Sequence, residues 1–151
     1  MRDKPKILFL STGDATRSHM AQGFLKKLCG EDFHIISAGV EAGEISPLAA
    51  EVMAEFGVDI AGQQSTKVAD LLKHNCVCGV MIFDAARERS PIFPFTLKLL
   101  RWSIADPCRT PGEPSEQRQA FRAARDQIRA ETEKLLNEMG PQYAHRAPMA
   151  A

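Results

Sequence analysis

The segment that decides the fold is residues 7–24, Ile7-Leu8-Phe9-Leu10-Ser11-Thr12-Gly13-Asp14-Ala15-Thr16-Arg17-Ser18-His19-Met20-Ala21-Gln22-Gly23-Phe24. Four apolar residues lead into a short polar loop, and from Arg17 onward apolar residues recur at helical spacing. This order predicts a buried strand, a tight loop and a helix. Such a loop directs backbone N–H groups to one point at a helix N-terminus, where the helix dipole adds positive partial charge. Because the Arg17 guanidinium can grip a tetrahedral oxyanion through two hydrogen bonds, we interpret the segment as an anion cradle.

Length and composition indicate one domain without a polyanionic partner. A chain of 151 residues can bury a core that needs no disulfides, and nineteen basic against nineteen acidic residues give no electrostatic support for nucleic-acid binding. No apolar run approaches the roughly 20 residues of a membrane span, and the N-terminus lacks the apolar core of a signal peptide. We therefore expect a cytoplasmic protein without a membrane partner, with its domain in residues 1–139 and a loose tail in residues 140–151.

The rest of the chain alternates between strand and helix patterns. Further strands are predicted over residues 33–38, 76–83 and 99–104, and further helices over residues 46–57, from residue 65 onward, and over residues 113–139. Residues 76–83 are apolar on both faces, as is typical of a parallel sheet covered by helices on each side. The chain is therefore predicted to form a single-domain α/β fold, a doubly wound parallel sheet of four strands with helices on both faces. Ligands of such sheets bind at the carboxyl ends of the strands, where Ser11, Ser90 and Asp106 emerge.

The four cysteines do not predict a metal or cofactor site. They lack paired Cys-x2-Cys spacing and the density of a disulfide scaffold. Cys29, Cys76 and Cys78 are predicted to be buried small hydrophobic residues.

The spacing of the loop resembles a known family. Five residues separate Ser11 from Arg17, as in the Cys-x5-Arg-Ser loop of the low-molecular-weight tyrosine phosphatases and of the thioredoxin-coupled arsenate reductases that share their fold. The family's Ser-Ala-Gly, Pro-x-Ala, Gly-x-Asp-Ile and Ser-x-Lys landmarks follow in order within residues 37–67, and Asp106 stands in an Asp-Pro pair like the family's. The resemblance covers nearly the whole chain and implies the strand order 2-1-3-4.

The resemblance also implies which catalytic groups are missing. The first loop residue of the family is a cysteine whose thiolate attacks phosphorus or arsenic, and two further cysteines of the reductases relay the regenerating disulfide. The corresponding residues of this chain are Ser11, Phe83 and Ser90. A serine hydroxyl needs a general base beside it, and the loop sequence offers none.

The resemblance implies roles for the polar residues around the loop. The anion-binding set would be Ser11, Thr12, Gly13, Asp14, Ala15, Thr16, Arg17 and Ser18. Asp14 stands where the family usually has asparagine, and its charge would oppose an anion unless it points away or finds a partner. Gln22 stands where reductases often have glutamate, in a polar cluster that holds potassium in some of them. Asp106 is either the family's general acid or a cap of its own loop, and His19 is expected at the surface.

These observations favour a family member that has lost catalysis and keeps a loop for phosphate, arsenate or sulfate. Its expected partners are a phosphate-like oxyanion or a phosphorylated ligand, and a protein. The alternatives are an active phosphatase that uses Ser11, a reductase that relies on Cys108, and an engineered cysteine-to-serine substitution at Ser11 that traps ligands.

Overall fold

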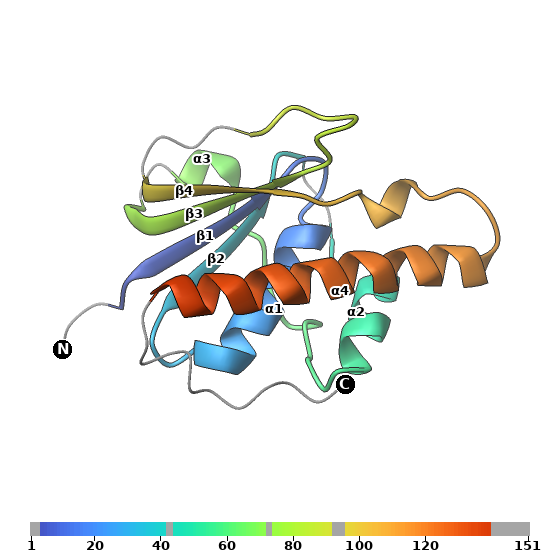
Figure 1. Cartoon of the computed structure of the whole chain (residues 1–151), viewed down its shortest axis with the longest axis horizontal. Coiled ribbons are helices and arrows are strands. Elements are labelled where there is room, and N and C mark those ends of the chain that lie inside the picture. The colour runs from blue at the N-terminus through green and yellow to red at the C-terminus, as the bar shows by residue number, and fades with distance from the viewer. Residues whose placement is uncertain (1–3, 42–43, 72–73, 92–95, 140–151) are drawn as a thin grey trace.

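The computed structural model describes residues 4–41, 44–71, 74–91 and 96–139 (Figure 1). The predicted C-terminal tail, residues 140–151, lies outside these ranges. The elements in chain order are β1 (Lys6–Ser11), α1 (Thr16–Cys29), β2 (His34–Gly39), α2 (Pro47–Ala54), α3 (Val68–Leu71), β3 (Cys76–Phe83), β4 (Thr96–Ser103), the 3-10 helix η1 (Pro107–Arg109) and α4 (Pro114–Met139).

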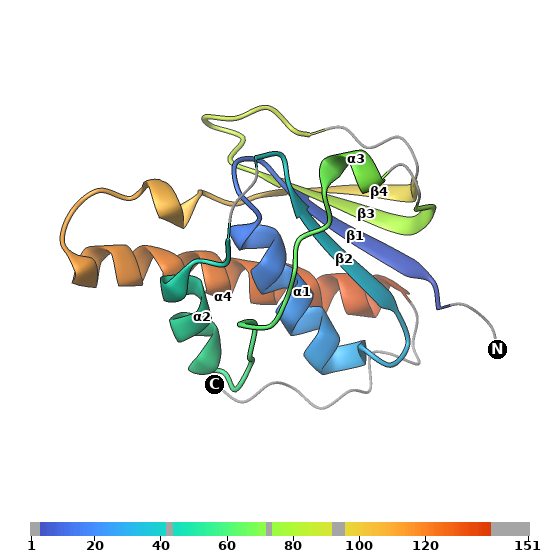
Figure 2. The same ribbon diagram turned by 180° about the vertical axis from the view of Figure 1, so that it is seen from behind.

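The four strands form one parallel sheet in the order β2-β1-β3-β4, which confirms the predicted topology (Figure 2). β1 lies at the centre, and its residues Ile7–Ser11 are buried. Its last residue, Ser11, is in register with Gly39 of β2 and Ile82 of β3. The two neighbouring strands thus fix the backbone at the point where the loop of residues 12–15 begins.

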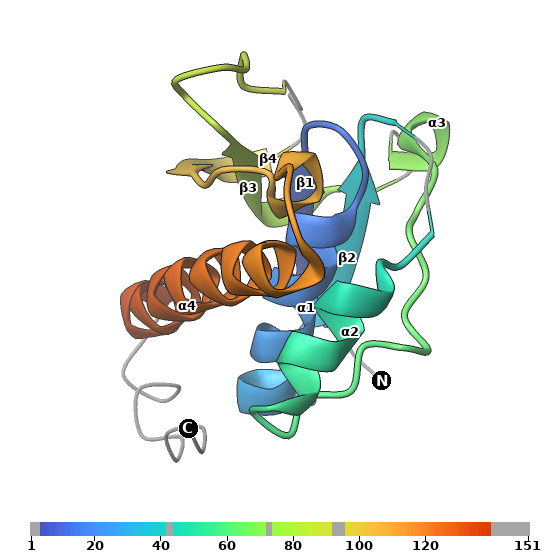
Figure 3. The ribbon, with the colours of Figure 1, turned by 90° about the vertical axis from the view of Figure 1, so that its right-hand side faces the viewer.

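Helices cover the two faces of the sheet unequally. α1, α2 and α4 lie on one side, and α3 lies on the other (Figure 3). The larger apolar core joins the sheet to Phe24 of α1, Val52 of α2 and Ile128 of α4. A smaller cluster on the opposite face includes Leu8, Met81 and Leu71 of α3. Among the described residues, no helix combines the length and the apolar character needed to cross a membrane.

Several element boundaries differ from the predictions. The helix predicted over residues 46–57 ends at Ala54, and β4 and α3 show further differences. β4 was predicted over residues 99–104 but runs from Thr96 to Ser103, because its pairing with β3 starts at Cys76. The helix predicted from residue 65 is a single turn, Val68–Leu71, and residues 72–73 lie outside the described ranges. Propensity and apolar spacing located these elements, whereas strand pairing and tertiary packing set their ends.

Candidate functional site

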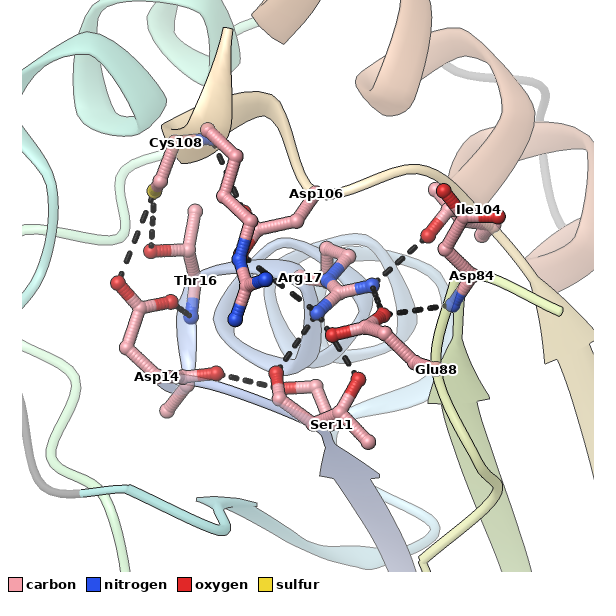
Figure 4. A network of polar contacts seen from close by, with 12 residues as sticks. Ser11, Asp14, Thr16, Arg17, Asp84, Glu88, Ile104, Asp106 and Cys108 are labelled. Atoms are coloured by element: carbon pink, nitrogen blue, oxygen red, sulfur yellow. Dashed lines mark hydrogen bonds and ion pairs between the residues drawn. The ribbon is translucent and has the colours of Figure 1, made fainter. Parts of the chain in front are cut away.

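The loop after β1 lies at the carboxyl edge of the sheet, where the sequence placed it (Figure 4). The Thr12 N–H donates to the Ile82 carbonyl at 3.0 Å, so the β1–β3 pairing continues one residue past the strand. On the other side, the Val40 N–H donates to the Ser11 carbonyl at 3.0 Å. The start of the loop is therefore tied to the chain on both sides of β1.

Not all peptide groups of the loop direct their N–H groups toward one point, as an anion cradle would require. The Thr12 carbonyl accepts a hydrogen bond from Arg17 at 2.7 Å, and the Asp14 carbonyl accepts one from the Ser11 hydroxyl at 2.8 Å. The Gly13 carbonyl points outward and accepts from the Glu41 N–H at 2.8 Å. Because N–H and C=O point in opposite directions across a peptide, the Asp14 N–H faces inward. The prediction that several N–H groups converge on one spot is thus too simple for this conformation.

The Ser11 hydroxyl has only neutral partners. It donates to the Asp14 carbonyl and lies 3.3 Å from the Ser18 hydroxyl, which in turn lies 3.0 Å from the Ala38 carbonyl. Within the described ranges, no carboxylate, imidazole or amine contacts this hydroxyl. Serine attack requires such a base, so the geometry supplies no means of activating Ser11.

Arg17 is fully buried and nearly saturated with acceptors. Nη1 donates to Glu88 at 3.0 Å and to the Ile104 carbonyl at 2.8 Å, and Nη2 donates to the carbonyl and the hydroxyl of Thr12. A carboxylate oxygen of Asp106 lies 3.8 Å from Nη2. Nε is buried and has no partner among the described residues. A buried donor without an acceptor is costly, so Nε is where a ligand oxygen would be stabilising.

Asp14 and Asp106 both cap short turns. One oxygen of Asp14 accepts from the Thr16 N–H at 3.0 Å at the start of α1, and one oxygen of Asp106 accepts from the Cys108 N–H at 3.0 Å. Asp14 therefore finds a hydrogen-bond partner, which is one of the two possibilities that the sequence left open for its charge. Asp106 serves as the cap of its own loop. Gly13 has a positive φ of 66° and lies close to Asp106. A Cβ atom added at residue 13 would be 3.4 Å from the Asp106 carboxylate.

Cys108 is exposed and borders the loop. Its sulfur lies 3.5 Å from the Thr16 hydroxyl and 3.6 Å from the Asp14 carboxylate. Although the residue as a whole is exposed, its sulfur is partly buried where it contacts Thr16. This partial burial, together with the nearby carboxylates, raises the pKa of the Cys108 thiol to about 12. The ligand atoms of Asp14, Asp106 and Cys108 lie within 4.8 Å of one another, but Arg17 beside them opposes a cation. The other cysteines are buried, as predicted.

His19 and Gln22 of α1 both have hydrogen-bond partners in other segments of the chain. His19 was expected at the surface but is buried, because residues 63–65 cover the first turn of α1 and the Ser65 hydroxyl lies 2.9 Å from its Nε2. Burial lowers the pKa of His19. Gln22 donates to the Ile35 carbonyl and accepts from the Ser37 hydroxyl, so its side chain ties α1 to β2.

In the described part of the chain, the Ser11 hydroxyl makes its hydrogen bonds to Asp14 and Ser18 and not to Phe83 or Ser90. Phe83 ends β3, and the Ser90 hydroxyl donates to the neighbouring Pro91 carbonyl at 3.0 Å. The segment between them instead contributes Glu88, which the sequence analysis did not single out. Seventy-one positions separate Glu88 from Arg17, so no local pattern could have indicated their contact.

Glu88 stands at the wall of a cleft of about 260 Å³ next to the loop. The cleft is also lined by Asp84, Arg87, Asp106 and Arg109, so charges of both signs surround it. Burial raises the pKa of the Glu88 carboxyl, but hydrogen bonds from Arg17, from the Asp84 N–H and from the Thr12 hydroxyl lower it overall. Glu88 is thus ionised at neutral pH.

Known proteins are similar to this chain over most of its length. The family described as low molecular weight phosphotyrosine protein phosphatase matches residues 6–145. An arsenate reductase of Bacillus licheniformis is 34% identical over 125 residues, which are 83% of this chain and 90% of that protein. Arsenate reductase 2 of Staphylococcus epidermidis is 34% identical over 133 residues, 88% of this chain and 97% of its own length.

Solved structures show the same architecture. An arsenate reductase in its phosphate-binding state superposes with a TM-score of 0.73 at 25% identity, over 90% of this chain and 99% of that one. A protein tyrosine phosphatase superposes with a TM-score of 0.66 at 18% identity, which indicates a shared fold.

Proposed function

The chain belongs to the low-molecular-weight phosphotyrosine protein phosphatase family, and we propose that it is a member that binds a tetrahedral oxyanion without transforming it. Arg17 carries this proposal. Its guanidinium is fully buried at the loop, and its Nε lacks an acceptor among the described residues. An oxyanion oxygen at Nε, with the inward Asp14 N–H beside it, would satisfy that donor and use the charge of the arginine.

The proposed loss of chemistry rests on the groups around Ser11. Its hydroxyl is bonded to a carbonyl and to a second hydroxyl, and neither can take up its proton. Disulfide relay would need thiols at residues 83 and 90, where this chain has Phe83 and Ser90. An engineered substitution at Ser11 alone would explain only the first of these three residues.

A reductase that relies on Cys108 is the competing function. Its sulfur lies within reach of Thr16 and Asp14 at the rim of the loop, which is the observation that favours it. A thiol with a pKa of about 12 is almost entirely protonated at neutral pH, however, and the thiolate is the reactive form. Cys108 therefore has no catalytic role in the proposed function.

The proposed ligand is free phosphate or arsenate, or a phosphate group carried by a partner protein, in the cytoplasm. Relatives of this chain are named arsenate reductases, and one of them has been solved in a phosphate-binding state. Because these names concern the relatives and not this chain, both anions belong in the test.

Nuclear magnetic resonance of the ¹⁵N-labelled protein tests the proposal at the atoms concerned. Phosphate and arsenate, added separately, should shift the Arg17 Nε–H signal and the amide of Asp14 in a saturable manner. Chloride at equal ionic strength is the control for salt effects. Unchanged signals from both groups at millimolar oxyanion, with the protein folded, would overturn the proposal.

A further inference from the structure

Two donors from separate parts of the chain converge on the carboxylate of Glu88. The Arg17 guanidinium donates at 3.0 Å, and the Asp84 N–H donates at 2.7 Å. A guanidinium and a backbone N–H directed at one anionic group are the components of an anion site. In this structure, a side chain of the protein itself fills that site (Figure 4).

The contacts of Arg17 leave no complete edge for a second anion. Both Nη1 contacts and both Nη2 contacts are made within the protein, and only Nε is open. A bidentate grip needs two N–H groups on one edge. An oxyanion can reach Nε directly, but to bind a second N–H of Arg17 it must displace an acceptor that Arg17 now holds.

Charge adds to this competition. The single positive charge of Arg17 faces Glu88 at 3.0 Å and Asp106 at 3.8 Å, and Arg109 lies 3.6 Å from the same Asp106 oxygen. Arg109 is largely exposed, so solvent screens its charge. A bound dianion would therefore meet two carboxylates for one buried guanidinium, and like charges in a partly buried site repel strongly.

Glu88 is the acceptor most able to move. Thr12 and Ile104 offer backbone carbonyls fixed next to β1 and β4, where the Thr12 N–H and the Ile104 N–H are bonded to β3. Glu88 is a long side chain on the turn of residues 84–88, and it borders the cleft beside the loop. Rotation about its side-chain bonds would carry the carboxylate into that cleft without disturbing the sheet.

We propose that Glu88 is the resident anion of the oxyanion site: its carboxylate holds Arg17 in the ligand-free protein, and a soluble oxyanion that takes up a second N–H of Arg17, in addition to Nε, displaces it. Glu88 thereby sets the affinity of the site and disfavours highly charged ligands. This inference rests on the proposed function, since it concerns the same guanidinium.

The test measures sulfate binding by calorimetry at pH 7.5, because sulfate remains a dianion there and protonation of the ligand cannot contribute. The variants are Glu88→Gln, which keeps the shape and removes the charge, and Glu88→Ala. Glu133→Gln is the matched control, since Glu133 pairs with Arg129 on α4 and has no contact with the loop. We expect both Glu88 variants to bind sulfate about tenfold or more tightly than the wild type, as removal of one nearby like charge implies, and the control to be unchanged.

A second measurement follows the displaced side chain. The Asp84 amide, which now donates to Glu88, should shift and lose protection from hydrogen exchange when sulfate saturates the wild type. Equal or weaker sulfate binding by both Glu88 variants, or an Asp84 amide that is unaffected at saturation, would overturn the inference. If the wild type binds through Arg17 but the variants bind no better, only this inference fails. If the wild type does not bind and Glu88→Gln does, Glu88 occupies the site without being displaced, and the proposed function fails together with the displacement.

Discussion

Gly39 at the end of β2 lies directly against Ala15 of the loop. A Cβ on Gly39 would be 2.5 Å from the Ala15 nitrogen and 2.5 Å from the Asp14 carbonyl carbon, which is closer than real Cβ atoms approach. The Asp14–Ala15 peptide is therefore packed closely against the end of β2. The carbonyl of this peptide accepts the hydrogen bond from the Ser11 hydroxyl.

Substitution of Gly39 by alanine should push the loop away from the sheet. The neighbouring atoms are backbone and cannot rotate aside, so we expect Gly39→Ala to lower the free energy of unfolding by about 1–3 kcal/mol, the usual cost of overpacking. Gly62→Ala is the matched control, because a Cβ there meets nothing within 4 Å. Urea denaturation of both variants measures the difference. Equal stability of the two variants would show that the loop yields freely.

Replacement of Arg17 should weaken oxyanion binding more than the loss of one surface charge does. Arg17→Ala removes a buried charged donor, and we expect the binding free energy of phosphate to fall by about 1.5–3 kcal/mol, the usual worth of such a hydrogen bond. Arg101→Ala is the control, since Arg101 is exposed on β4. Calorimetry that gives the same affinity for the Arg17 variant and the control would place the anion elsewhere.

A cysteine at residue 11 should restore hydrolysis of a small aryl phosphate but not arsenate reduction. Hydrolysis needs a thiolate at the loop and a guanidinium for the oxyanion, whereas reduction also needs the thiols missing at residues 83 and 90. Asp14 would raise the pKa of the new thiol through its charge, so Ser11→Cys with Asp14→Asn should be the more active protein. Asparagine keeps an oxygen for the Thr16 N–H. If the double variant is inert although its thiol has an ordinary pKa, the mechanism of the family does not transfer to this loop.

Alkylation of Cys108 should be slow although the residue is exposed. A pKa of about 12 leaves roughly a thousandth of the thiolate of an ordinary cysteine at pH 8, because the ordinary value lies about three units lower. Iodoacetamide labelling followed by mass spectrometry measures the rate. Asp14→Asn removes one of the carboxylates that raise the pKa and should accelerate labelling. A wild-type rate close to that of a free thiol would revive the role of Cys108 in reduction.

The strand order and the place of the site could be predicted from the sequence because they depend on local patterns. The apolar run before Ser11 and the apolar residues after Arg17 identify a strand and a helix, and alternation of such units leads to a parallel sheet. Parallel strands bring their carboxyl ends to one edge, so Ser11 and Asp106 were expected near each other.

The state of the site depends on contacts between distant segments and could not be predicted in that way. The pairing of Arg17 with Glu88 and the burial of His19 under residues 63–65 join parts of the chain that no periodic pattern connects. Contacts with other segments also orient the loop peptides. The Glu41 N–H donates to the Gly13 carbonyl, and Gly39 packs against Ala15.

Arsenite production is the measurement that tests the central claim most directly, namely that this family member binds an oxyanion without transforming it. Purified wild type is incubated with arsenate, thioredoxin, thioredoxin reductase and NADPH, and arsenite is quantified against Ser11→Ala and Cys108→Ser. We expect arsenite to stay at the level of the Ser11→Ala protein at every wild-type concentration. Arsenite that rises in proportion to the wild type and disappears in either variant would contradict it.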